Sequence, residues 1–275
     1  MTKLYDENNL KNLLVNTEKE ELQQYLADIH PADILEVLRD EEIDKSVIMK
    51  KLPTWMVANL FEEMDDEEKE EFLNLFSNLE QYKIVNEMSS DEITDLLYNL
   101  EPERINEFLT NIDKEDAEEV KALLTYDEET AGGLMATEFI SIKESMTVKD
   151  ALKYLQTAGI NAETAYYLYV LDDTGILKGI VSLRELVIAT FKTKISDIMH
   201  ENVKSIPTDM DQDEVAYLFE KYGFQAMPVI DTNGEMQGVV TVDDIFEVIR
   251  EEATEDILRL AGVNEGEVID GKTVD

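Results

Sequence analysis

The sequence has no cysteine and only two histidines, which excludes several common kinds of site. Without cysteine, the chain of 275 residues cannot form a disulfide, a zinc–thiolate site or a cysteine nucleophile. With only His30 and His200, one chain cannot offer several histidines to a transition metal. Pairs of carboxylates occur, but no histidine or activated nucleophile accompanies them, so we expect no enzyme.

Basic residues are scarce, which limits the partners that the chain can bind. There are 24 Lys and Arg against 63 Asp and Glu, a net charge of −39. Nucleic acid and anionic membrane surfaces are therefore not expected as partners, because both require clustered positive charge. Two interpretations of the acidic charge remain open. It serves as a solvated, soluble surface, or some of the carboxylates bind a hard cation such as Mg²⁺ or Ca²⁺.

Long apolar runs are also missing. No stretch approaches ~20 consecutive apolar residues, so we expect no transmembrane helix. The first residues lack the apolar core of a signal peptide, and we expect a soluble, cytoplasmic chain.

Glycine is absent from the first 131 residues, which predict helix after helix. Apolar residues recur at helical spacing, and proline stands at the expected first turns of several helices. Similar short amphipathic blocks recur, which predicts a repeat that stacks into a superhelix. These blocks cover residues 29–38, 52–61, 88–97 and 100–109.

The pattern changes at Gly132 and Gly133, after which β-rich runs such as 139–142 and 203–206 appear. The second half contains an internal duplication. Ile142 aligns with Ile206 at an offset of 64, and Gly179 aligns with Gly238 at an offset of 59. From Asp243 onward, a single long helical pattern runs to near Gly262.

The duplicated unit, residues 135–250, resembles the cystathionine-β-synthase (CBS) domain. Each copy ends in an apolar strand, a glycine turn, a second strand and a helix start, at 170–185 and 228–244. Four further segments resemble MgtE-type magnesium transporters. They are HPADI at 30–34, MSSDE at 88–92, TAGGLM at 130–135 and VTVDDIFEVIREEATED at 240–256.

The resemblance to MgtE implies a multi-domain fold. It comprises an all-α superhelical domain (1–131), two α+β CBS domains in tandem (132–196 and 197–250) and a C-terminal connecting helix with a tail (251–275). It also implies a homodimer through the CBS domains and a membrane domain that would follow, so we expect a piece of a longer protein on the cytoplasmic side of a membrane. The implied function is Mg²⁺ sensing that closes the pore.

Asp91 and Asp95 lie four residues apart and share one face of an expected helix. A solvated polar face and half of a divalent-cation site both fit this pattern. The resemblance implies that these aspartates bind Mg²⁺ together with Asp244, although the residues alone do not rank Mg²⁺ above Ca²⁺ or Mn²⁺.

A carboxylate stripe follows Asp244 on the last expected helix. Glu247, Glu251 and Glu255 continue it, while Glu252 and Asp256 form a second pair. An exposed acidic helix explains the stripe equally well. The resemblance implies that Glu252, Glu255 and Asp256 bind metal where the connecting helix meets the CBS domains.

A third set of positions lies around the helix of the second CBS copy. Related sequences use positions matching Asp213, the carbonyl of Glu220, Gly223 and Glu247 for a metal. Acids in a first turn commonly serve the helix dipole instead. Relatives can carry an acid where Gly223 stands, so the sequence departs from the family there.

An adenine nucleotide such as ATP is the alternative ligand, because CBS pairs often bind one. The acids expected to bind ribose are Glu185 and Asp244, which follow Ser182 and Thr241. Arg184 would meet a phosphate, and Tyr167 and Phe224 would flank the base. The alternative function is therefore a nucleotide-sensing CBS regulator with a helical-repeat scaffold.

Overall fold

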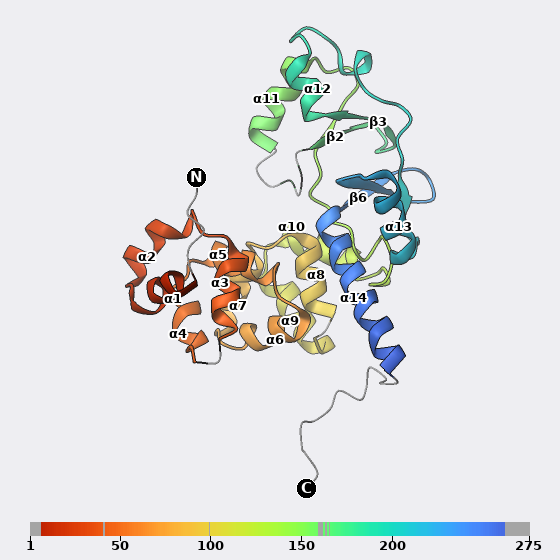
Figure 1. Cartoon of the computed structure of the whole chain (residues 1–275). Helices are drawn as coiled ribbons and strands as arrows, with labels where there is room; N and C mark the ends of the chain where they lie inside the picture. Colours follow the sequence, from red (N-terminus) through yellow and green to blue (C-terminus); the bar gives the residue numbers. More distant parts are fainter. Residues whose placement is uncertain are drawn as a thin grey trace. The chain divides into compact units, whose positions relative to one another are not determined.

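The computed structural model describes residues 7–40, 42–98, 100–158, 162, 164 and 166–261, excluding the side chains of 7, 8, 66, 67, 158, 251, 252 and 255–261. It divides into two compact units, Met1–Leu124 and Thr125–Asp275 (Figure 1). Each unit is described by itself. Among the described helices, none has the length and apolar character that a bilayer crossing requires.

The first unit is entirely helical in its described part. Its helices are α1 (Glu7–Asn16), α2 (Lys19–Leu26), α3 (Pro31–Leu38), α4 (Lys45–Met49), α5 (Thr54–Phe61), α6 (Asp66–Leu73), α7 (Asn78–Val85), α8 (Ser90–Tyr98), α9 (Pro102–Asn111) and α10 (Lys114–Leu123). Pro31 and Pro102 occupy first turns, where a missing N–H leaves no bond unmade. Asp44 and Asp65 accept hydrogen bonds from the backbone at the starts of α4 and α6.

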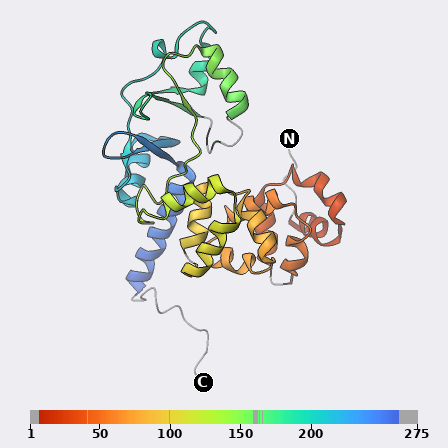
Figure 2. The same ribbon diagram turned by 180° about the vertical axis from the view of Figure 1, so that it is seen from behind.

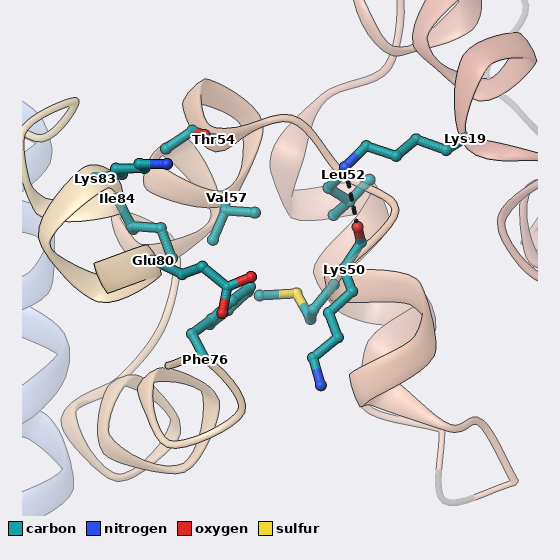
Figure 3. A pocket seen from close by; sticks show the side chains of 10 residues that line it. Lys19, Lys50, Leu52, Thr54, Val57, Phe76, Glu80, Lys83 and Ile84 are labelled. Carbon is teal, nitrogen blue, oxygen red and sulfur yellow. Dashed lines mark hydrogen bonds between the residues drawn. The ribbon is translucent and has the colours of Figure 1, made fainter. Parts of the chain in front are cut away.

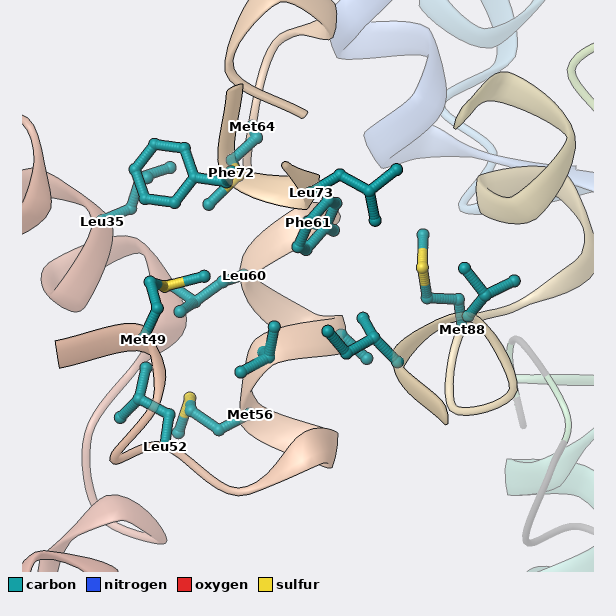
Figure 4. Close-up of a cluster of buried hydrophobic side chains, with 14 of the residues drawn as sticks. Leu35, Met49, Leu52, Met56, Leu60, Phe61, Met64, Phe72, Leu73 and Met88 are labelled. Atoms are coloured by element: carbon teal, nitrogen blue, oxygen red, sulfur yellow. The ribbon is translucent and has the colours of Figure 1, made fainter. Parts of the chain in front are cut away.

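Alternate helices of this unit pack on one another. α1 contacts α3, α3 contacts α5 and α5 contacts α7, while α6 contacts α8 and α8 contacts α10. The apolar faces meet in one continuous core, which includes Leu35, Met49, Leu60, Phe61 and Phe72 (Figure 4). This stacking of alternate helices confirms the predicted superhelical repeat.

The second unit contains two three-stranded sheets of the same topology, β1-β2-β3 and β4-β5-β6. In the first copy β1 (Ser141–Ile142) pairs parallel with β2 (Tyr167–Leu171), which pairs antiparallel with β3 (Leu177–Ser182). In the second copy β4 (Ile206–Pro207), β5 (Ala226–Ile230) and β6 (Met236–Thr241) repeat this arrangement.

The helices complete each copy of the duplicated unit. They are α11 (Val148–Ala158), α12 (Leu183–Ile188), the short 3₁₀ helix η1 (Ile195–Asp197), α13 (Gln212–Tyr222) and α14 (Val242–Ala261). The two copies differ most at their last helix. α12 has 6 residues, whereas α14 has 20 and is drawn in blue as one long helix in both views (Figure 2).

Backbone pairing between the two copies explains the repeated glycines. Ala136 and Val239 exchange two N–H···O bonds of 2.8 and 2.9 Å, and Ile180 and His200 exchange an equivalent pair of 3.0 and 2.9 Å. A Cβ on Gly238 would lie 2.5 Å from the Ala136 carbonyl oxygen. The neighbouring copy's backbone therefore requires glycine at this position.

The duplication and the long last helix are confirmed, but two expected strands are shorter than predicted. Of the runs 139–142 and 203–206, only Ser141–Ile142 and Ile206 belong to strands, and Pro207 extends the latter. Ile140 pairs its carbonyl with Tyr169, but the residues before it turn locally, since the Phe139 N–H donates to Thr137.

Candidate functional site

The two candidate aspartates of the helical unit lie on α8. Asp91, in the first turn, is buried with 7% of its surface exposed, and Asp95, one turn later, is half-buried. α8 packs against α6 and α10, which brings Lys69 of α6 close to it. The solvated-face interpretation is therefore wrong for Asp91.

The surroundings of Asp91 disfavour its charge. Burial raises the pKa of Asp91, although hydrogen bonds from Ser89 and the Glu92 backbone and the charge of Lys69 oppose this. Burial also raises the pKa of the adjacent Glu92 to about 7, against the opposing charge of Lys69. The Glu92 Oε2 atom lies 3.3 Å from the Lys69 Nζ atom, in an ion pair.

One oxygen of Asp91 has no donor among the described residues. Its Oδ1 atom is buried and accepts no hydrogen bond there. An unsatisfied buried carboxylate oxygen is energetically costly, and a hard cation with oxygen ligands would satisfy it. The carboxylate oxygens of Asp91 and Asp95 are thus suitable ligands for Mg²⁺ or Ca²⁺.

The carboxylate of Asp244 has a structural role at the start of α14. Its Oδ2 atom accepts hydrogen bonds from the Thr241 N–H at 2.9 Å and the Thr241 hydroxyl at 2.8 Å. Glu185 does the same for α12, accepting from the Ser182 N–H at 2.9 Å and hydroxyl at 2.7 Å. These caps were not predicted from the sequence, although a Ser or Thr followed by an acid three residues later is their usual signal.

The third candidate set is distributed over α13 and the start of α14. Asp213 and Glu220 are exposed at opposite ends of α13, and half-buried Glu247 on α14 pairs with Arg250 at 2.8 Å. Gly223 ends α13 in the left-handed region at φ 66°, which glycine adopts without strain. Among the described side chains, no three acids or histidines cluster closely enough to hold a metal ion.

Three candidate acids cannot be placed. The side chains of Glu252, Glu255 and Asp256 lie outside what the structure describes, although the backbone of α14 continues through them to Ala261.

Four of the five nucleotide positions lie at one end of the β2–β3 pair of the first CBS copy. Tyr167 and Ser182 are directly paired residues of β2 and β3, and the exposed Arg184 and half-buried Glu185 follow in α12. Phe224 belongs to the second copy, where its ring centre lies 5.5 Å from that of Tyr222. The other oxygen of Glu185 contacts the His200 Nε2 atom at 2.5 Å. Burial acts to raise the pKa of Glu185, but its bonds to Ser182 and His200 outweigh burial and lower it.

Known families match both units. Residues 29–129 match the MgtE intracellular N domain, and residues 131–191 and 195–251 match the CBS domain. The magnesium transporter MgtE of Thermus thermophilus is 36% identical over 262 residues, which cover 93% of this chain and 58% of that protein. The chain therefore spans little more than half the length of this relative.

Solved structures agree with the sequence relationship. The crystal structure of the soluble part of a magnesium transporter is 33% identical, with a TM-score of 0.83 over 90% of this chain and 100% of that one. A second, the cytosolic domain of the Mg²⁺ channel MgtE in complex with ATP, is also 33% identical, with a TM-score of 0.73 over 88% of this chain and 95% of that one. The resemblance and the fold class inferred from the sequence are confirmed, and the chain belongs to the MgtE family of magnesium transporters, whose cytosolic region it matches.

Proposed function

We propose that this chain is the Mg²⁺-sensing region of a magnesium channel or transporter, and that it closes the pore when Mg²⁺ bridges its two units. Asp91 and Asp95 would supply the ligands of the helical unit, and Asp244 that of the CBS unit. The observation that carries the proposal is the buried Asp91 Oδ1 atom, which has no donor among the described residues. The proposed setting is the cytoplasmic side of the membrane, and catalysis has no part in it.

Electrostatics supply the mechanism. Two unit charges 4 Å apart repel by about 4 kcal/mol at an effective dielectric constant near 20. In a chain of net charge −39, several such pairs would outweigh a modest interface between domains. Mg²⁺ would remove this repulsion. It would also bind the closed state more tightly than the open state, and this difference in affinity would shift the equilibrium towards closure.

The remaining acids would act on the helix that leads to the pore. In this proposal Glu252, Glu255 and Asp256 bind Mg²⁺ near the end of the CBS domains and order α14, whose partner is a membrane domain of the same protein. Asp213, the Glu220 carbonyl, Gly223 and Glu247 would form a weaker site. Ca²⁺ and Mn²⁺ would compete, since the ligands are oxygens.

Small-angle scattering tests the central step. The chain is titrated with Mg²⁺ at constant ionic strength, and we expect its radius of gyration to fall in the millimolar range. Asp91→Ala/Asp244→Ala should remove the change. The matched control is Asp28→Ala/Asp197→Ala, which removes one exposed acid from each unit. A radius that stays flat in the wild type, or responds equally in the candidate-site variant, contradicts the proposal.

We propose a homodimer as the working assembly, formed through the CBS domains. Two groups of apolar side chains on the CBS unit are exposed, and a second copy of the chain would bury them. They are Val187, Ile188 and Phe191 at α12, and Phe246 and Ile249 on α14.

A second candidate function is the sensing of an adenine nucleotide. It is supported by the relative whose cytosolic domain was solved in complex with ATP. Tyr167, Ser182, Arg184, Glu185 and Phe224 are the residues that would bind it here. Calorimetric titration with ATP, with and without Mg²⁺, separates this function from Mg²⁺ sensing alone.

A further inference from the structure

The helical unit contains a pocket that the magnesium proposal does not use. It offers about 100 Å³ of free volume. For comparison, a cavity of ~150 Å³ holds benzene. Its lining comes from separate parts of the chain, the start of α2, the α4–α5 connection and α7 (Figure 3).

The floor of the pocket is apolar. Met49, Leu52, Val57 and Ile84 are buried, and Phe76 adds an aromatic face. Such a floor favours a ligand with a hydrocarbon body over a bare inorganic ion, because carbon atoms of the ligand can pack against it.

The rim of the pocket is positive in an otherwise acidic unit. Lys19, Lys50 and Lys83 line it, with Glu80 as the one acid among the lining residues. Hydrogen bonds from Ser77 hold Glu80 at the start of α7, where its Oε2 atom accepts from the Ser77 N–H at 2.9 Å and hydroxyl at 2.6 Å. These bonds lower the pKa of Glu80, and the charges of Lys50 and Lys83 lower it further.

The lysines of the rim differ from most other basic residues of the helical unit in their ion pairing. Six basic side chains there form ion pairs, those of Lys11, Arg39, Lys45, Lys69, Arg104 and Lys114. In the part of the chain that the structure describes, Lys19, Lys50 and Lys83 form none. Lys19 donates one hydrogen bond to the Lys50 carbonyl at 3.2 Å, which leaves further N–H groups of its ammonium for a ligand.

The two lysines that suit a ligand lie on opposite sides of the floor. Figure 3 shows Lys19 and Lys83 on either side of Val57, whereas the Lys50 side chain turns away from Lys19. Helix ends explain part of this arrangement, because Lys83 lies in the last turn of α7. They do not account for an apolar pocket between the two ammonium groups.

We propose that this pocket binds a short aliphatic dicarboxylate, with its hydrocarbon body on the apolar floor and one carboxylate at each of Lys19 and Lys83. The site is separate from the acids of α8 and gives the helical unit a second small-molecule input. The surrounding negative charge weakens binding at low ionic strength, but it is screened beyond ~8 Å at physiological salt.

Methyl NMR of the full chain, labelled at the methionine methyl groups, tests this with glutarate as the probe. Met49 lines the pocket, and Met49→Leu identifies its resonance. We expect a saturable shift of the Met49 signal, and a dissociation constant at least about tenfold higher in Lys19→Gln/Lys83→Gln. The matched control is Lys114→Gln/Lys121→Gln on α10, which changes the charge equally and should bind as the wild type does.

Two further probes identify the ligand chemistry. Butyrate, which has one carboxylate, and inorganic phosphate, which has no hydrocarbon body, should both bind more weakly than glutarate. The proposal is overturned if Met49 shows no saturable shift, if the lysine variant retains its fold by circular dichroism and binds glutarate equally well, or if phosphate or butyrate binds as tightly as glutarate.

Discussion

The Nζ atom of Lys69 lies 3.3 Å from the Glu92 Oε2 atom within the helical unit, and the Glu92 side chain is 18% exposed. Lys69 is 4% exposed, and Asp91, next in sequence to Glu92, is 7% exposed. One buried acid and one partly buried acid therefore lie close to one buried base. Removing one partner of a buried ion pair leaves an uncompensated charge away from water, which costs more than the pair contributes when intact.

Lys69→Met should lower the free energy of unfolding by about 3–5 kcal/mol near pH 8 without divalent cations, because it leaves both acids without the buried cation. Urea denaturation measures the change. The control is Lys45→Met, since the Lys45–Glu71 pair of 2.9 Å is more exposed, with side chains 29% and 57% accessible, and should be worth less than about 1 kcal/mol. Equal losses in the two variants would show that the Lys69 charge has no special role.

The buried group around Lys69 marks the limit of what the sequence predicts. Helical spacing places Asp91 and Asp95 on one face of α8, but it does not show that Asp91 is covered. Lys69 lies more than twenty residues earlier, and only the packing of α6 on α8 brings it close. Convergence of this kind depends on tertiary structure, so periodicity does not reveal it.

The structure of the duplicated half is easier to predict from the sequence, because each repeated residue has a local structural role. Gly175 and Gly234 recur since both turns need a positive φ, 84° and 83°. The Ser182–Glu185 and Thr241–Asp244 caps repeat because each begins a helix, and their spacing alone would have identified them. The pocket lysines come from three separate segments, and no sequence signal links them.

The Arg39–Glu68 pair should make the free energy of unfolding depend on pH in the acid range. Arg39 donates two hydrogen bonds of 2.7 Å to the Glu68 carboxylate, and these bonds hold the pKa of Glu68 below its usual value. Because the folded-state pKa is the lower one, the contribution is complete above the unfolded pKa of about 4.5 and is lost as pH falls through the folded value.

Arg39→Gln should therefore destabilise the chain by about 1 kcal/mol at neutral pH and by progressively less below about pH 4.5. The Arg39 side chain is 52% exposed, so solvent limits the effect. Urea midpoints of the wild type and the variant across this range give the difference. A difference that stays constant down to the acid limit would mean that the Glu68 charge is not responsible.

Gly238→Ala should disturb the junction of the two CBS copies. The added Cβ would meet the Ala136 carbonyl oxygen at 2.5 Å and the Met135 side chain at 2.9 Å, so the backbone must shift. We expect a loss of about 1–3 kcal/mol, measured by thermal and urea unfolding. Gly179→Ala, whose closest contact is the His200 carbonyl at 3.0 Å, should cost less. The reverse order would contradict this account of the glycines.

Ile188→Asp/Phe246→Asp should weaken the proposed dimer. These side chains are 72% and 66% exposed, and a second copy would bury them. Introducing carboxylates there leaves charge without a partner in an apolar interface, so we expect the sedimentation coefficient to move to that of a monomer. Val47→Asp, on a half-exposed apolar residue of the helical unit, is the control. A wild type that sediments as a monomer at high concentration would refute the proposed assembly.

Arg184→Ala tests the nucleotide function apart from the magnesium function. Arg184 is exposed and lies between Ser182 and Glu185, whose cap fixes the start of α12 and hence the backbone at Arg184. Loss of a charge-assisted contact to phosphate should raise the ATP dissociation constant at least about tenfold in calorimetry. Lys178→Ala is the matched control, because that base pairs with Asp172 at 3.3 Å. If ATP binds the wild type and both variants alike, Arg184 does not contact the nucleotide. If ATP binds none of them while Mg²⁺ still compacts the chain, magnesium sensing stands without the nucleotide.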